Sequence, residues 1–232
     1  MKKFLCSLFL SLPFLAFAQQ NVDGIGQIRV GRTFSQITAD LGISKNKIHD
    51  VSDGNARFAD LYHPSRITLA RWVPGNSYGS DIEHYYLTCP NAYKLYLPKY
   101  EVAGIEMEDL ELRFLNDTLY ALNISNPSVA FTNAMKTKYG KGRTEKSSKK
   151  AECNSDLEEV RYETNWNGEN DETIAFEVVE EYRNSACDKK YLNYFAVWYK
   201  PSYFYVSDCA TEALKKARQR RDGDDKSKLN DF

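Results

Sequence analysis

Four acidic residues in a short stretch, Glu106, Glu108, Asp109 and Glu111, are the first candidates for chemistry in this sequence. Glycoside hydrolysis needs two carboxyl groups that face one bond, about 5 to 9.5 Å from each other. Alternation along a β-strand places Glu106 and Glu108 on the same face, which comes near to that arrangement. The same pattern is typical of a solvated strand edge, where charge discourages aggregation between sheets. A glycoside-type hydrolase and a charged surface are both open explanations of these carboxylates.

The other residue types that carry chemistry do not fall into a catalytic or cofactor-binding pattern. The chain contains three histidines, His49, His63 and His84. They lack the spacing of a metal site, and no G-x-S-x-G sequence marks a serine nucleophile. Gly24 and Gly26 begin a dinucleotide-binding pattern, but Arg29 stands where the third glycine is required. The sequence therefore predicts no cofactor and no metal.

Aromatic residues are the most unusual feature of the chain, and they are dense in the stretch YLNYFAVWYKPSYFYV at residues 191–206. Tyr and Trp provide a large contact area at low conformational cost, so they favour a binding surface. Aromatic residues also favour strands and pack between a sheet and solvent, which is the alternative explanation. The candidate binding residues are Tyr191, Tyr194, Trp198, Tyr199, Tyr203 and Tyr205.

Residues 1–18, MKKFLCSLFLSLPFLAFA, have the three parts of an export signal: basic residues, an apolar stretch and a small-x-small cleavage site. Cleavage before Gln19 leaves 232 − 18 = 214 residues, and the loss of Lys2 and Lys3 changes the net charge from −1 to −1 − 2 = −3. No later apolar run is long enough to cross a membrane, and a charge so near zero does not favour a nucleic-acid partner. We therefore expect a periplasmic or secreted protein whose partner is a protein or glycan of the cell envelope.

Four cysteines remain after removal of the signal: Cys89, Cys153, Cys187 and Cys209. An even number in an oxidising compartment favours two disulfides, although buried free thiols are also common. Pairing Tyr162 with Phe176 across a turn at residues 167–170 brings residue 153 near residue 187, within the reach of a disulfide. Of the three pairings that four cysteines allow, the sequence therefore predicts Cys153–Cys187 and, by elimination, Cys89–Cys209.

The elements that would position these residues begin with a short capped helix. Thr33 and Gln36 have the spacing of a capping box. Phe34, Ile37 and Leu41 fall on one face of the helix and predict its buried side.

Residues 30–42, VGRTFSQITADLG, resemble the G-x-T-x-x-Q-V-x-x-x-L-G signature of a group of small exported bacterial domains. The matching residues are Gly31, Thr33, Gln36, Ile37, Leu41 and Gly42. The group includes the small lipoprotein of the outer-membrane barrel-assembly machinery and β-lactamase inhibitory protein. The resemblance implies helices packed on an antiparallel sheet, in some members as tandem repeats, and a role in binding proteins rather than in catalysis. It departs at Arg32, where Met is usual, and no binding residue of the group can be transferred to this chain.

The rest of the first half is predicted to be rich in strands. Short strands are expected at Ala56–Tyr62, Ile67–Trp72 and Ile82–Thr88. A hairpin follows, with alternating apolar residues Leu110, Leu112 and Phe114, then Tyr120, Leu122 and Ile124. A three-residue loop at 116–118 would place both sets on one face, and a bulge is expected near Glu108 and Asp109.

In the second half, too, a helix is predicted to precede the strands. A helix is predicted from Ser128 to Tyr139, ending at Gly140, which echoes the helix that ends at Gly42 and suggests two related halves. Residues 141–152 form a charged connector, and a meander follows in which residues 191–199 are apolar on both faces, as in a central strand. A final helix leads into the charged residues 215–232.

Together these patterns predict an α+β fold, with short helices packed on a mainly antiparallel, Tyr-rich sheet and two disulfides. The predicted divisions are the signal 1–18, an α+β half 19–140, the connector 141–152, a meander and helix 153–214, and the tail 215–232. We interpret the chain as an exported bacterial binding module without catalytic activity. A glycoside-type envelope hydrolase and a purely structural envelope protein are the alternatives.

Overall fold

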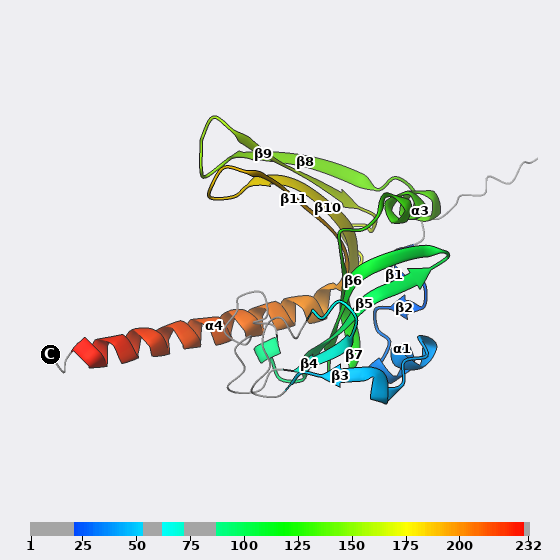
Figure 1. Cartoon of the computed structure of the whole chain (residues 1–232), viewed down its shortest axis with the longest axis horizontal. Helices are drawn as coiled ribbons and strands as arrows, with labels where there is room; N and C mark the ends of the chain where they lie inside the picture. Colours follow the sequence, from blue (N-terminus) through cyan, green and yellow to red (C-terminus); the bar gives the residue numbers. More distant parts are fainter. Residues whose placement is uncertain (1–20, 53–61, 72–86, 230–232) are drawn as a thin grey trace, which may run out of the picture.

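A nine-stranded, mostly antiparallel sheet extends through the molecule in the computed structural model, which describes residues 21–52, 62–71 and 87–229 (Figure 1). The strand order is β3-β4-β5-β6-β7-β11-β10-β9-β8. The strands are β3 (Ile48–Asp50), β4 (Ile67–Arg71), β5 (Ala92–Val102), β6 (Ile105–Leu115), β7 (Thr118–Ser125), β8 (Arg143–Lys150), β9 (Glu158–Asn165), β10 (Thr173–Arg183) and β11 (Lys189–Tyr199). Among the described strands, only β3 and β4 pair in parallel. The predicted export signal lies outside the described residues.

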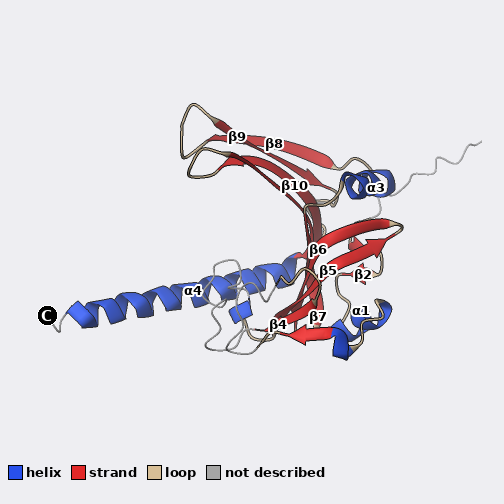
Figure 2. Ribbon diagram, viewed as in Figure 1, coloured by secondary structure: helices blue, strands red, loops and turns tan. Residues whose placement is uncertain are grey.

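Helices pack against this sheet, which confirms the predicted α+β class (Figure 2). The described helices are α1 (Phe34–Asp40), α3 (Val129–Tyr139) and α4 (Lys200–Leu229), with a 3₁₀ turn η1 (Lys45–Lys47) before β3. A separate two-stranded sheet consists of β1 (Gly24–Ile25) and β2 (Ile28–Arg29).

The two faces of the large sheet are covered by different elements (Figure 1). α1, α3 and the β1–β2 sheet lie on one face, here called the α3 face, where Ile28, Ile37 and Phe131 are buried in the main core. α4 starts on the opposite face, here called the α4 face, where Val206 and Tyr120 are buried. From there α4 extends away from the sheet, on the same side as the ends of β8–β11 (Figure 1).

The two halves of the described chain share a helix and four antiparallel strands in the same order, and the first half also has β1, β2, η1 and β3. In each half a helix is followed by a four-stranded antiparallel meander: α1 and β4–β7, then α3 and β8–β11. Gly42 and Gly140, which follow the two helices, both have positive φ angles, 62° and 85°. The last strands, β7 and β11, pair antiparallel and join the two meanders into one sheet. The prediction of two related halves is therefore confirmed at the level of topology.

Local hydrogen bonds fix both helices where the sequence predicts them. At α1 the Thr33 side chain accepts from the Gln36 N–H, and the Gln36 side chain accepts from the Thr33 N–H, which completes the capping box. At α3 the Ser128 hydroxyl accepts from the Phe131 N–H, and Met135 lies on the buried face with Phe131. The capping box predicted at α1 is confirmed, and the cap at Ser128 is an additional one.

The β6–β7 hairpin has the predicted strands but a different turn. Its turn contains two residues, Asn116 and Asp117, both with positive φ (49° and 66°), which matches the favoured two-residue hairpin turns. A β-bulge at Tyr120 then shifts the register by one residue. Tyr120 consequently lies on the α4 face, whereas Leu122 and Ile124 lie in the core of the α3 face. The three-residue loop was wrong because the bulge corrects the strand parity instead.

An irregularity near Asp109 is present, but it is not the predicted bulge. The β5–β6 ladder keeps one register throughout and is interrupted opposite Pro98, which has no N–H to donate. Asp109 has a left-handed backbone with φ 53°. Met107 and Leu110, on either side of it, both reach the core of the α3 face. The change of parity therefore comes from a local break in both strands rather than from an extra residue in one.

The register between β9 and β10 differs from the predicted one by three residues. Tyr162 pairs with Val179 instead of Phe176. The reason is that the connection spans residues 166–172, longer than a four-residue turn, since Trp166 is buried in the main core. Tyr162 therefore lies on the α3 face, and Phe176 lies on the α4 face.

The predicted short strands, the charged connector and the final helix can also be compared with the structure. The predicted strand at 67–72 is confirmed as β4, whereas most of the strands predicted at 56–62 and 82–88 lies outside the described residues. Most of the predicted charged connector forms strand β8. The final helix starts at Lys200, with Pro201 in its first turn where Pro is favoured, and continues through the charged residues to Leu229.

Candidate binding surface

Three of the six predicted binding residues, Tyr194, Trp198 and Tyr203, meet on the α4 face. The rings of Trp198 and Tyr203 stack with 4.0 Å between centroids and 6° between planes. Phe176 makes edge contacts with Trp198 at 4.6 Å and with Tyr194 at 5.8 Å. Trp198 also donates from Nε1 to Asn123 Oδ1 at 3.1 Å. These rings contact one another and join α4 to β11, so their geometry is that of packing.

The other three predicted residues lie apart from this cluster. Tyr199, at the end of β11, packs partly buried against the α4-face core. Tyr205 on α4 is 55% exposed, and Tyr191 on β11 is 67% exposed. Tyr191 points to the α3 face, because it has the same parity as the buried Phe195. The sequence therefore named residues of at least two different surfaces.

Tyr191 belongs to an exposed apolar patch with Tyr162 and Val179, here called the distal patch. Tyr162 pairs directly with Val179 across β9 and β10. Val179 pairs with Asn193 on β11, so Tyr191 is its diagonal neighbour. Tyr162 is 43% and Val179 is 40% exposed, which is unusual for three adjacent residues of this kind on one sheet face.

α3 covers the same sheet face only up to the border of the distal patch. The Phe131 ring lies 5.0 Å from that of Phe195, and Thr132 Oγ1 donates to Glu177 Oε1 at 2.6 Å. Farther along β10 and β11, no described element lies over the distal patch, consistent with its exposure. It is an open surface on the described part of the molecule.

Cations lie next to both rings of the distal patch. Lys146 Nζ is 5.8 Å from the centroid of Tyr162, and Lys189 Nζ is 5.3 Å from that of Tyr191, both within the range of cation–π interactions. Glu181, which lies opposite Tyr191, is paired with Lys189 at 2.7 Å. Lys146 belongs to none of the described ion pairs, so it leaves positive charge at the rim of the patch for an acidic ligand.

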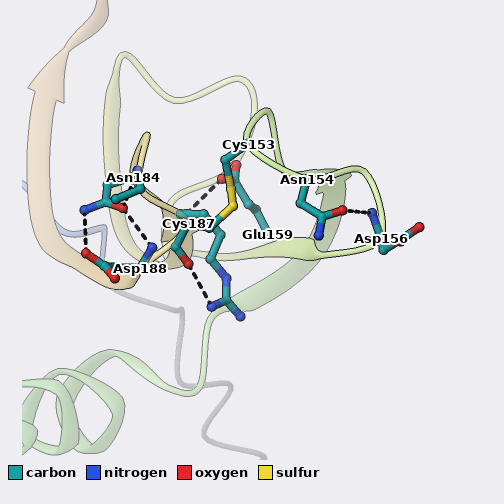
Figure 3. Close-up of a disulfide and its surroundings, with 9 residues drawn as sticks. Cys153, Asn154, Asp156, Glu159, Asn184, Cys187 and Asp188 are labelled. Atoms are coloured by element: carbon teal, nitrogen blue, oxygen red, sulfur yellow. Dashed lines mark hydrogen bonds between the residues drawn. A yellow bond between two sulfur atoms is a disulfide. The ribbon is translucent and has the colours of Figure 1, made fainter.

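A disulfide fixes the end of the sheet beside this patch (Figure 3). Cys153 and Cys187, with Cα atoms 5.6 Å apart, join the loop after β8 to the loop between β10 and β11. In the second loop Asn184 Oδ1 accepts from the N–H of Asp188 at 2.8 Å. The other disulfide, Cys89–Cys209, connects α4 to the segment before β5, with Cα atoms 5.8 Å apart. Both predicted pairings are confirmed.

The acidic residues of β6 are distributed between a small cavity and the protein interior. Glu106, Glu108 and Asp109 line a cavity of about 220 Å³, below the range of about 300–1,000 Å³ that is common for ligand sites. Glu106 pairs with Lys99 at 3.0 Å, and Asp109 accepts a hydrogen bond from the Tyr96 hydroxyl. Two of the three carboxylates are thus engaged by neighbours, and the space is small for a glycan.

Glu111 instead forms a buried charge cluster on the α4 face. Its carboxylate pairs with Arg113 and, at 3.1 Å, with Lys94, and it accepts from the Tyr62 hydroxyl at 3.0 Å. Burial opposes ionisation of Glu111, but the two cations outweigh it and hold the pKa of this carboxyl well below its usual range. A carboxylate so strongly stabilised is a poor proton donor, so this cluster is suited to structure rather than to acid catalysis.

The histidines do not assemble a metal site in the described part of the chain. His49 is exposed on β3, His63 Nδ1 lies 3.3 Å from Ser65 Oγ, and His84 lies outside the described residues. Within residues 21–52, 62–71 and 87–229, no three His, Cys, Asp or Glu side chains are grouped to hold a metal ion. None of the described helices has the length and apolar character needed to span a bilayer.

No family model matches this chain. No curated protein and no solved structure matches it either. The resemblance of residues 30–42 to the exported binding domains therefore stays a prediction, and any function must be argued from the geometry.

Sequence reasoning missed two of the three residues of the distal patch, Tyr162 and Val179. Their exposure depends on the β9–β10 register, which pairs them on the α3 face. A signal for it was present in Glu181, which follows Val179 at the same parity and indicates a less buried end of this face of β10.

Proposed function

We propose that this protein is an exported, non-catalytic binding module of the bacterial envelope, and that the distal patch contacts its partner, a protein or glycan. The observation that carries this proposal is the exposure of Tyr162, Val179 and Tyr191 on a sheet end that a disulfide holds in place. Exposed aromatic residues on a rigid support lose little conformational freedom when they bind.

Two further features support this function. The two disulfides are typical of proteins from oxidising compartments, which agrees with the export signal predicted at residues 1–18. The buried carboxylate of Glu111 is already paired with Lys94 and Arg113. The cavity beside Glu108 is small for a glycan, so the hydrolase alternative has less support.

The test is recovery of partners from envelope extracts and glycan pools by the oxidised chain that starts at Gln19. The variant Tyr162→Ser/Tyr191→Ser removes both rings of the distal patch, and we expect it to lose the specific partner. Tyr205→Ser is the matched control, because it removes a ring of similar exposure on α4. The proposal is wrong if the double variant recovers the partner as well as the unmodified chain does, or if the unmodified chain recovers nothing specific.

A further inference from the structure

Strand β8 has a backbone edge that pairs with nothing in the described structure. Its one described neighbour is β9, and all eight of its residues are exposed. The N–H of Ala151 donates to the carbonyl of Leu157 at 3.0 Å, which marks a hydrogen-bonded pair of the β8–β9 ladder. Because such pairs alternate with non-bonded ones, the backbone groups that point away from β9 belong to Thr144, Lys146, Ser148 and Lys150.

In the first half of the molecule, the corresponding strand edge pairs with a further strand. β4 is the counterpart of β8, since each is the first strand of its meander and lies farthest from the β7–β11 junction. β3 pairs in parallel with the outer edge of β4, through residues 48–50 and 67–69. In the second half only residues 140–142 separate α3 from β8, so this half has no strand of its own for that place.

The charges of β8 favour one kind of added strand at its outer edge. Arg143 pairs with Glu169 at 2.8 Å and Lys149 pairs with Glu159 at 3.1 Å. Among the described ion pairs, none includes Lys146 or Lys150, whose backbone groups point outward. These two lysines, of which Lys150 lies opposite Glu158 and Lys146 opposite Tyr162, place positive charge along the free edge, which favours acidic side chains in an added strand.

The free edge is continuous with the distal patch. Lys146 pairs with Tyr162, so the outward-pointing residues of β8 carry their side chains on the α3 face. A strand added to β8 would extend that face by one row beside Tyr162. Its acidic side chains on that face would reach the lysines, and its alternate, apolar side chains would lie on the α4 face.

We propose that the outer edge of β8 binds an extended acidic segment of a partner protein by strand addition, as β3 binds β4. This inference rests on the proposed function and specifies its partner. A second copy of the chain fits less well, because antiparallel pairing of two β8 strands brings Arg143 of one toward Lys150 of the other, and like charges in opposing positions are unfavourable.

The first experiment uses a fluorescent eight-residue peptide of alternating Val and Glu as the probe, with the oxidised chain from Gln19. We expect saturable binding, and binding about tenfold weaker or absent for the same peptide with Lys in place of Glu. N-methylation of all residues of the Glu peptide removes the donors of both its edges, and we expect it to abolish binding. No binding of the Glu peptide at millimolar concentration would overturn the proposal.

The protein variant for the same assay is Ser148→Pro, with Ser148→Thr as its control. Proline at 148 removes an outward N–H while the bonds between β8 and β9 remain, and proline is tolerated on edge strands. We expect Ser148→Pro to bind the Glu peptide about tenfold more weakly, whereas Ser148→Thr binds as the unmodified chain does. If Ser148→Pro does not fold, the N-methylated peptide still decides the matter.

The outcomes separate this inference from the proposed function. Binding that depends on salt but not on N-methylation or on Ser148→Pro would mean simple charge attraction, and strand addition would be wrong. If extract partners are lost with Tyr162→Ser/Tyr191→Ser but retained with Ser148→Pro, the distal patch binds and the β8 edge does not. Concentration-dependent dimers in light scattering that Ser148→Pro dissolves would assign the edge to a second copy instead.

Discussion

The two halves of the molecule share one topology but use it differently. In the first half β5 is buried at six consecutive positions from Ala92 to Leu97, with neighbours on both faces and both edges. In the second half β8 is exposed at all of its positions, and the α3 face of β9 to β11 ends in the distal patch. A shared order of helix and meander therefore fixes where strands lie, whereas their side chains decide whether a strand is covered or available to a partner.

One disulfide joins the first half to α4, and the other lies within the second half. Reduced-state mimics Cys89→Ser/Cys209→Ser and Cys153→Ser/Cys187→Ser should lower the free energy of unfolding by about 5 and about 4 kcal/mol, from loops with sequence separations of 120 and 34. Urea denaturation of each double variant measures both values. The first bond also holds α4 on the sheet, so its loss should also disturb the Trp198–Tyr203 stacking, visible in near-UV circular dichroism.

The two disulfides should also differ in how readily a reductant reaches them. Cys89 is buried and its partner Cys209 is half-buried, whereas Cys153 and Cys187 are both half-buried, in loops at the end of the sheet. Dithiothreitol should therefore reduce Cys153–Cys187 first, as peptide mapping after timed alkylation would show. Reduction of Cys89–Cys209 first would contradict the view that the first half is the more closed one.

The sequence predicted best those features whose hydrogen bonds are local. The capping box at Thr33 closes within three residues of the chain, so spacing alone identifies it. The β9–β10 register was wrong because it depends on the first half: Asn167 Nδ2 donates to the carbonyl of Val22 at 2.9 Å, which helps to hold the longer connection. A contact between residues 145 positions apart leaves no signal in local patterns.

The disulfide Cys153–Cys187 was predicted correctly from an incorrect register. Both cysteines lie in loops at the same end of the sheet, beyond the ladder itself, and such loops absorb a shift of three residues. The candidate site was predicted less well. Tyr191 was found from composition, but the edge of β8 was interpreted as a connector, because Lys and Ser are poor strand formers and only pairing with β9 makes them a strand.

The two halves also differ in how deeply their ion pairs are buried. Glu111→Ala removes a carboxylate that is buried with Lys94 and Arg113, and it should lower the free energy of unfolding by about 3–5 kcal/mol because the cations are left uncompensated. Glu180→Ala in the second half removes a partner of the partly exposed Arg161, at 3.4 Å, and should cost under about 1 kcal/mol. Equal losses in urea denaturation would contradict the difference in burial.

The Glu111 cluster also sets a dependence on pH. The pKa of Glu111 is lowered in the folded protein by its cations, whereas in the unfolded chain it is about 4.3. The stabilisation is therefore complete above the unfolded pKa and is lost as the pH falls from there toward the folded pKa. Over that acidic range the free energy of unfolding of the unmodified chain should fall more steeply than that of Glu111→Gln. Parallel curves would mean that Glu111 is not the group that titrates.

The smallest effect, and the finest test, comes from two neighbouring residues of β10. Val178 is fully buried on the α4 face, and Val179 is 40% exposed in the distal patch. Val178→Ala should cost about 2 kcal/mol, from lost burial of two methyl groups and the space they leave. Val179→Ala should cost under about 1 kcal/mol, mainly through strand propensity. If instead Val179→Ala proved the more destabilising, the patch would be covered in solution, and a surface that is already covered could not receive a partner.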